Sequence, residues 1–446
     1  MEQNRHLGYS VIIGLLVFIL ALAMPSQNLL SDQFDFSGQQ IHPRTCGCGT
    51  CGLNAGGSQQ FGSTDSGQYV TTAGLTSATF GDHTQNAVNV YGESLKYFIY
   101  DQVGSIDFED NTSGTSLGHT SSDANFVRSV FSRLDSFVDL DFSESATWSG
   151  TTFDVYCLSS YSGWGSSTVG SVNDQGSGSG SYWDVMWKKT NSGSLSDFDA
   201  VTVVHEIGHA LGLSHPFEDP SNGLWNTDDT IMSYNIGPDG WNTWFSDIDI
   251  ATMIEIWGVE DDNGNGYDGT SGRDVVRGST KHEIFAGYSG DDEIRGLRGK
   301  DTLFGYDGVD ELRAGNGRDY IWGGKGGDEM YGGFGHNTFG DERDGSADDI
   351  YFKSDQFAYN YIYDSAGNSP NGEKVDILKG LETIDRIYMQ GVTTSSLSFQ
   401  SINNFSTPSG VFSGIGIYTN GYLEAIYTGG DLTAAQVQSI TSGVAV

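Results

Sequence analysis

The stretch His205-Glu206-Ile207-Gly208-His209-Ala210-Leu211-Gly212-Leu213-Ser214-His215 predicts how the central part of this chain folds. His205 and His209 are four residues apart, so a helix would place both imidazoles on one face. Gly212 would end that helix and let the chain turn back, which brings His215 toward the same point. Three nitrogen ligands leave one position of a tetrahedral zinc ion open to water, as a catalytic site requires. Glu206, beside the first histidine, could then reach that water.

The alternative interpretation is an ordinary helix that carries two solvated histidines. A glycine and a third histidine at fixed offsets disfavour it. The helix is also predicted independently, because Asp197 or Asp199 can cap its start. Its apolar packing would come from Phe198, Val203, Ile207, Ala210 and Leu211. Gly208 weakens the helix, but its missing side chain would permit close packing beneath a metal.

A second motif, Ile231-Met232-Ser233-Tyr234, follows the histidines. Together with His205–Pro216, it resembles the signature of the serralysin branch of the metzincin metalloproteases. The resemblance implies that the three histidines bind zinc and that Glu206 is the general base. It also implies that Met232 forms an apolar floor under the metal, and that Tyr234 ligates zinc at rest and swings to the oxyanion during catalysis. Without the zinc motif, Met232 and Tyr234 would be taken for ordinary core residues.

Residues 269–340 repeat with a period of nine. Each unit has a turn rich in glycine, then an acidic or amide residue, and then one apolar residue. The apolar residues are Val276, Phe285, Ile294, Leu303, Leu312, Ile321, Met330 and Phe339. The pattern is that of the RTX nonapeptide, and the resemblance implies a parallel β-roll in which two nonapeptides form one coil. A flexible Gly/Asp-rich linker is the alternative, which the unbroken apolar position disfavours.

The repeat turns are predicted to bind calcium, because glycines expose carbonyl oxygens and aspartates add hard anionic oxygens. The expected ligands are Gly287, Gly290, Asp292, Gly296, Gly299, Asp301, Gly305, Gly308, Asp310, Gly317, Asp319, Gly326 and Asp328. The second unit departs from the pattern with Lys281 and Glu283, and the last has Asn337, which weakens the prediction there. Without calcium the acidic turns should repel one another, so we expect residues 269–340 to fold only with calcium.

A short acidic segment, residues 261–268, precedes the repeats. It resembles the start of an EF-hand loop but lacks the full pattern. A separate ion and a polar linker are equally compatible with it.

The composition excludes some functions and favours others. The chain has 446 residues and a net charge of −37, from 58 acidic against 21 basic residues. This balance argues against nucleic-acid binding and for calcium-rich or saline surroundings. The length suits two or three domains, and 37% hydrophobic residues suffice for real cores.

The N-terminus carries an apolar run from Tyr9 to Met24 after a weakly charged start. We expect residues 1–23 to be an export signal cut near Ala23, with an uncleaved membrane anchor as the alternative. Serralysins usually lack such a signal and use C-terminal information for export. The two routes conflict, but both indicate a secreted, extracellular protein.

Residues 24–85 are predicted to be a pro-segment or linker, because they are rich in Gly, Ser, Thr and Gln. Cys46, Cys48 and Cys51 cluster there, and Cys157 lies in the expected catalytic domain. Disulfides suit an exported protein with an even cysteine count. A thiolate that blocks the zinc position until it is removed, or a separate metal site, is also compatible with the cluster.

Residues 86–260 are expected to form the metzincin zinc protease domain. Residues 95–100 should be a strand, and residues 126–138 have helical spacing with Ser122 or Asp123 as the cap. Residues 181–187 alternate like a strand, which could be the edge strand that pairs with substrate or an ordinary buried strand. A closing helix should run from Ser246 to Trp257.

The predicted fold class is an α+β metzincin catalytic domain, an RTX calcium-binding β-roll over residues 261–345, and a β-rich C-terminal module over 346–446. In that module, Asn420-Gly421 between two apolar runs predicts a β-hairpin. The predicted function is a secreted, monomeric, zinc-dependent endopeptidase that hydrolyses extracellular proteins. A calcium-dependent adhesion protein with an inactive protease domain, and a hydrolase of another substrate class, are the alternatives. Any membrane contact would come only from an uncleaved N-terminal segment.

Overall fold

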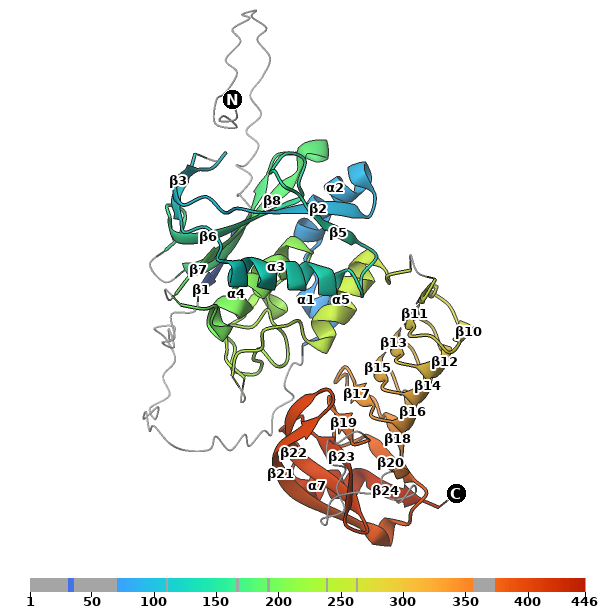
Figure 1. The fold of residues 1–446 in the computed structure, drawn as a ribbon. Coiled ribbons are helices and arrows are strands. Elements are labelled where there is room, and N and C mark those ends of the chain that lie inside the picture. The colour runs from blue at the N-terminus through green and yellow to red at the C-terminus, as the bar shows by residue number, and fades with distance from the viewer. Residues whose placement is uncertain are drawn as a thin grey trace, which may run out of the picture. The chain divides into compact units, whose positions relative to one another are not determined.

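We describe a computed structural model of the chain (Figure 1). The structure describes residues 31–35 and 70–445, apart from 110, 166–167, 191–192, 238–239, 262–263 and 356–373. The predicted signal or anchor at residues 1–23 and Cys46, Cys48 and Cys51 lie outside these residues. Among the described residues, no helix is long and apolar enough to cross a membrane. The described residues form two units, with 31–35, 72–135 and 140–249 in the first and 70–71, 136–139 and 250–445 in the second.

The first unit is built on an eight-stranded mixed sheet, with the strand order β1-β7-β8-β6-β2-β5 and with β4 joining β3 to β6. Its strands are β1 (Ser31–Asp35), β2 (Ser94–Ile99), β3 (Gly104–Asp107), β4 (Ser113–Ser116), β5 (Asp141–Glu144), β6 (Phe153–Tyr161), β7 (Thr168–Gln175) and β8 (Tyr182–Lys188). Its helices are α1 (Thr72–Leu75), α2 (Ala78–Tyr91), α3 (Ser121–Leu134) and α4 (Asp197–Ala210), with short 3-10 turns η1 (Gly178–Gly180) and η2 (Pro216–Glu218). Helix α5 (Asp247–Trp257) begins in this unit and ends in the second.

The predicted strands and helices are present, but both predicted helix caps were misplaced. Helix α3 starts after Thr120, whose side chain accepts from the Asp123 backbone while the Asp123 carboxylate accepts from the Thr120 backbone. Helix α4 has the same arrangement with Ser196 and Asp199. In such a capping box the acid sits three residues inside the helix, and the hydroxyl residue before it is the cap.

The folded first unit includes part of the expected pro-segment. The expected boundary between residues 85 and 86 falls inside α2. The side chain of Leu75 is fully buried, and the backbone N–H of Ser77 donates to the Gly212 carbonyl at the end of α4. Thr84 donates through its hydroxyl to the Ala210 carbonyl. Residues 72–85 therefore support the helix that carries the histidines.

The second unit contains the predicted parallel roll (Figure 1). Successive short strands alternate between two sheets, so each strand pairs in parallel with the strand two places along the chain. The strands of the roll are β9 (Gly266–Asp268), β10 (Val275–Arg277), β11 (Ile284–Ser289), β12 (Glu293–Gly299), β13 (Thr302–Asp307), β14 (Glu311–Gly317), β15 (Tyr320–Lys325), β16 (Glu329–Gly335) and β17 (Thr338–Gly340). Val276 lies opposite Ile294, which confirms that two nonapeptides make one coil.

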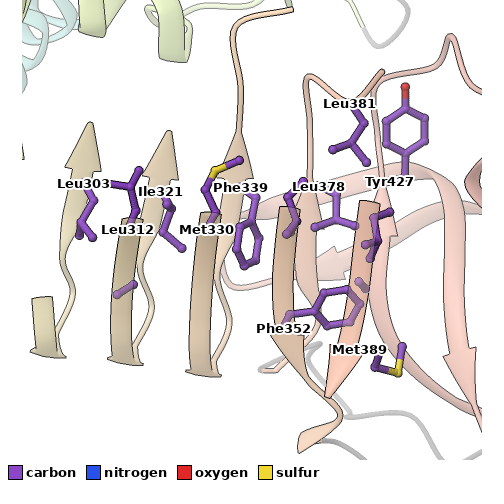
Figure 2. Packing of buried hydrophobic residues seen from close by; sticks show 14 of the residues in the cluster. Leu303, Leu312, Ile321, Met330, Phe339, Phe352, Leu378, Leu381, Met389 and Tyr427 are labelled. Carbon is purple, nitrogen blue, oxygen red and sulfur yellow. The ribbon is translucent and has the colours of Figure 1, made fainter. Parts of the chain in front are cut away.

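The eighth position of every repeat lies in one apolar core. Figure 2 shows Leu303, Leu312, Ile321, Met330 and Phe339 in a row between the two sheets. The same core continues without a break into the C-terminal strands, where it includes Phe352, Leu378, Met389 and Tyr427. The nonapeptide strands and the C-terminal strands therefore share one core, across the expected boundary at residues 345/346.

The C-terminal strands extend both sheets of the roll. They are β18 (Asp349–Lys353), β19 (Asp376–Leu378), β20 (Arg386–Gln390), β21 (Leu397–Thr407), β22 (Gly410–Thr419), β23 (Tyr422–Tyr427) and β24 (Thr441–Val444), with η3 (Thr394–Ser396) and α7 (Ala434–Ile440) between them. The predicted hairpin is confirmed, because β22 and β23 pair antiparallel around Asn420-Gly421. Both turn residues have positive φ, 48° and 87°, as an Asn-Gly hairpin turn requires.

Candidate zinc and calcium sites

The three predicted histidines converge in the first unit. His205 and His209 project from α4, and Gly212, with a φ of 102°, turns the chain so that His215 returns to them. The Nε2 atom of His215 lies 3.2 Å from Nε2 of His205 and 3.3 Å from Nε2 of His209. Zinc–nitrogen bonds of about 2.0–2.1 Å at tetrahedral angles place ligand nitrogens roughly 3.3 Å apart. The spacing of the three nitrogens therefore fits one zinc ion.

Backbone carbonyls orient two of the imidazoles. Nδ1 of His205 lies 2.9 Å from the Ile231 carbonyl, and Nδ1 of His209 lies 2.8 Å from the Leu213 carbonyl. A proton on each Nδ1 would donate to its carbonyl and leave the Nε2 lone pair facing the shared centre. Burial, together with the neighbouring imidazoles, holds the pKa of His205 and of His215 well below the usual value. Neutral imidazole is the form that binds metal.

Glu206 is fully buried on α4 beside the histidines. Its carboxylate lies against Gly170 of β7, where a side-chain Cβ would overlap the carboxylate and the Thr202 methyl group. No pattern in the sequence singles out this glycine. Gly170 leaves room for the Glu206 side chain between α4 and β7.

Met232 and Tyr234 lie on two sides of the histidine cluster. The Met232 sulfur is buried under α4, and a Cβ added to Gly208 would lie only 3.0 Å from it. The close packing expected from Gly208 is therefore present. The Tyr234 ring, half-buried, has its centroid 4.9 Å from that of His215 and 5.7 Å from that of His205. Both residues thus lie beside the histidine cluster.

Asp249 on α5 supports the site and was not singled out from the sequence. It is fully buried, and its carboxylate accepts hydrogen bonds from the Thr230 hydroxyl (2.5 Å) and from the backbone N–H groups of Ile231 and Ser246 (both 2.8 Å). The carbonyl of Ile231 is the one that orients His205. Asp249 therefore positions a zinc-site histidine through the Met232 turn.

Residues 181–187 do not form an edge strand. Strand β8, which includes most of those residues, lies inside the sheet between β7 and β6, so of the two interpretations the ordinary buried strand is the one that the structure has. Periodicity alone does not distinguish an edge strand from an internal one. The N-terminal strand β1 pairs antiparallel with the outer side of β7, and Phe34 lies opposite Gly170. An extended segment of this chain therefore pairs with the strand that packs against Glu206.

The calcium turns form two regular rows along the roll. In each row, the backbone N–H of one repeat aspartate donates to Oδ1 of the aspartate one coil later. Examples are Asp292 to Asp310 (2.8 Å) and Asp301 to Asp319 (2.9 Å). The other oxygen, Oδ2, faces the glycines that begin the turns. Within the described part of the chain, Oδ2 of Asp292, Asp301, Asp310, Asp319 and Asp328 is buried without a hydrogen-bond partner.

A bound cation stabilises ionised carboxylate oxygens that are buried without a hydrogen-bond partner. Burial is the main cause that raises the pKa of Asp310 and Asp319 to about 7 and of Asp328 to about 8. Oxygen ligands arranged in this way fit calcium. The two repeats that depart from the sequence pattern also differ in structure. In one, Oε2 of Glu283 accepts a hydrogen bond from the backbone N–H of Ser279, and in the other the side chain of Asn337 has an amide in place of the carboxylate.

Two further features of the sequence, the short acidic segment and Cys157, can be placed in the structure. Asp268, in the short acidic segment, accepts from the Tyr288 hydroxyl at 2.6 Å and from the Val259 backbone at 3.2 Å. Cys157 is buried in β6 and free, and burial raises the pKa of its thiol to about 12.

Comparison with protein families agrees with both sites. Residues 110–255 match the family model of the reprolysin-like metallopeptidases of family M12B. Residues 268–303 and 304–339 match the model of the RTX calcium-binding nonapeptide repeat. The chain joins a metallopeptidase domain to RTX calcium-binding repeats. No match was found among curated proteins. Zinc is the metal implied for the metallopeptidase domain, and calcium is the metal implied for the RTX repeats.

Proposed function

We propose that this RTX metallopeptidase is a secreted, serralysin-like zinc endopeptidase that hydrolyses peptide bonds in extracellular proteins. The observation that carries the proposal is the set of three imidazole nitrogens, 3.2 and 3.3 Å apart, beside the buried Glu206. Zinc, when bound by His205, His209 and His215, would lower the pKa of a water and polarise the scissile carbonyl.

The residues of the chain would carry the proton and the developing charge. Glu206 would take the proton from the attacking water and pass it to the leaving amine. Tyr234, a resting ligand in serralysins, would donate from its hydroxyl to the oxyanion of the tetrahedral intermediate. Met232 would keep the space beneath the histidines apolar and fixed.

The substrate would bind as an extended peptide along the outer side of β7. The antiparallel pairing of β1 with β7 supports this position, because backbone hydrogen bonds to a sheet edge are independent of side-chain identity. The register brings a docked backbone past Gly170, which contacts Glu206.

The calcium-loaded roll would keep the second unit folded after export. RTX repeats support an extracellular location, where calcium is abundant, because the buried acidic turns depend on the cation. The proposal leaves calcium with a structural role and zinc with the catalytic one.

Hydrolysis of casein by the full chain, supplied with zinc and calcium, tests the proposed function. Glu206→Ala should retain zinc and lose at least about 10²-fold in kcat/KM, because it removes the general base. Glu255→Ala, an exposed substitution on α5, is the matched control and should keep full activity. Zinc binding without hydrolysis in the unchanged chain, after removal of the N-terminal segment, would favour a calcium-dependent binding protein instead.

A further inference from the structure

One row of calcium turns continues beyond the last nonapeptide. The backbone N–H of Asp310 donates to Oδ1 of Asp328, and that of Asp328 donates to Oδ1 of Asp348, both at 2.8 Å. The N–H of Asp348 donates in turn to Oδ1 of Asp385 at 3.3 Å. The match to the RTX repeat ends at residue 339, so this row reaches residues that no repeat unit contains.

Asp341 takes the place of a glycine in this row. In the preceding coil, the space that a Cβ at Gly305 would occupy is lined by Oδ2 of Asp310 and by the carbonyl oxygen of Gly323. One coil later, a Cβ at Gly323 would lie 2.6 Å from Oδ2 of Asp328 and 2.8 Å from Oδ1 of Asp341. The carboxylate of Asp341 therefore lies beside Gly323 at the position where, one coil earlier, the backbone carbonyl of Gly323 lies beside Gly305.

Three carboxylates meet at this point. One oxygen of each of Asp328, Asp341 and Asp348 lies within 4.8 Å of the other two. Asp328 and Asp348 are each 1% exposed. Oδ2 of Asp328 and Oδ2 of Asp341 are buried and accept no hydrogen bond from the residues that the structure describes. Burial and the neighbouring carboxylates raise the pKa of Asp341 well above its usual value.

Two basic side chains of this region are paired with other acids. Lys325 pairs with Asp307 at 3.1 Å, and Arg343 pairs with Asp431 at 2.5 Å. A bound cation would compensate the charge of these buried carboxylates. An all-oxygen set with three carboxylates suits calcium rather than a transition metal, which favours nitrogen or sulfur ligands.

We propose that Asp328, Asp341 and Asp348 form a further calcium site at the end of the repeats, in which Asp341 adds a carboxylate at the position where a repeat turn has a glycine. Because calcium affinity rises with the number of charged ligands, this site binds more tightly than the repeat turns. It fixes the segment 341–348, between β17 and β18, to the last repeat. Beneath it the apolar core passes without a break from Met330 to Phe352 (Figure 2), so the ion stabilises the junction of repeat and non-repeat strands.

Calcium titration of the metal-stripped full chain by calorimetry, with bound calcium counted by mass spectrometry, tests the site. Asp341→Asn keeps an acceptor for the Gly324 backbone N–H but removes the charge. Asp341→Gly places at this position the residue that the preceding coils have there, and so should be compatible with the fold. Asp344→Asn is the matched control, because Asp344 is an exposed acid of the same segment.

Both substitutions of Asp341 should weaken the tightest class of calcium binding by at least about tenfold, and Asp344→Asn should leave it unchanged. Circular dichroism at saturating calcium should show the roll folded in all three variants. Unchanged affinity and ion number in both Asp341 variants would overturn the proposal. Failure of both to fold at saturating calcium, while Asp344→Asn folds, would also overturn it, since Asp341 would then act independently of calcium.

Discussion

The zinc centre and the calcium roll differ in what holds their ligands together before an ion binds. In the zinc centre the ligands are uncharged imidazoles, and backbone carbonyls orient His205 and His209. In the roll the ligands are buried carboxylates with one unsatisfied oxygen each. Neutral ligands can be assembled by packing alone, whereas stacked carboxylates oppose folding until a cation arrives.

Removal of calcium should have the largest effect. At neutral pH, a calcium chelator with zinc supplied in excess should abolish the β-structure of residues 275–427 and leave the first unit folded. Hydrogen exchange measured by mass spectrometry would localise the loss, since the roll amides should exchange and those of α4 should stay protected. Protection of the roll without calcium would remove the contrast between the two regions.

The pH should act on the calcium-free roll in a defined direction. The pKa values of Asp301, Asp310 and Asp328 rise to about 6, 7 and 8 in the folded state, above roughly 3.9 for an unfolded chain. The folded state then binds more protons, so stability is present below about pH 4 and is lost as the pH rises through 6 to 8. Circular dichroism of the metal-free chain measures this, and a gain of structure with rising pH would contradict it.

Loss of the Tyr234 hydroxyl should affect only the zinc centre. Tyr234→Phe should lower kcat by about 10²–10³-fold, which is typical for one oxyanion donor. Calcium-dependent folding should not change, because the residue lies in the first unit. Tyr100→Phe, on the same unit, serves as the control. A loss of zinc without a loss of kcat at saturating zinc would assign Tyr234 to metal binding alone.

Asp249→Asn should weaken the zinc centre without altering its ligands. The substitution disturbs the hydrogen bonds that hold Ile231, whose carbonyl orients His205. Zinc affinity should fall by about 10–100-fold, as for other residues that support metal ligands. A chelator competition assay measures it, with Asp247→Asn on the same helix turn as the control. Equal zinc affinity in both variants would show that Asp249 only caps α5.

Local spacing explains what the sequence predicted well. The histidines, the Met232 turn and the nine-residue repeat are short-range patterns, so their geometry follows from the helix and the turn. The continued row of aspartates was not predictable, because its spacing changes. Asp348 lies 20 residues after Asp328, and Asp385 lies 37 residues after Asp348. These residues are neighbours only because the strands between them extend the same sheet.

Long-range pairing also explains what the sequence left open or missed. The alternation of residues 181–187 fits both an edge strand and a buried strand, because their position inside the sheet depends on β7 folding back beside them. Asp249 carried a local signal, since Ser246 and Asp249 have the spacing of a capping box. That signal predicts a helix cap and contains nothing about its bond to Ile231, 18 residues away.

The smallest predicted effect concerns the edge of β7. Strand β1 pairs with this edge in the position proposed for substrate, with Phe34 opposite Gly170. Because β1 is covalently attached, it competes with a free peptide for the edge of β7 at a high effective concentration, and this competition raises the KM of the peptide. Deletion of residues 31–35 should therefore lower KM for an extended peptide several-fold and leave kcat unchanged. Deletion of five residues elsewhere in the N-terminal segment is the control. If both deletions leave KM unchanged, substrate does not use the outer side of β7, and the preformed zinc centre must be approached from another direction.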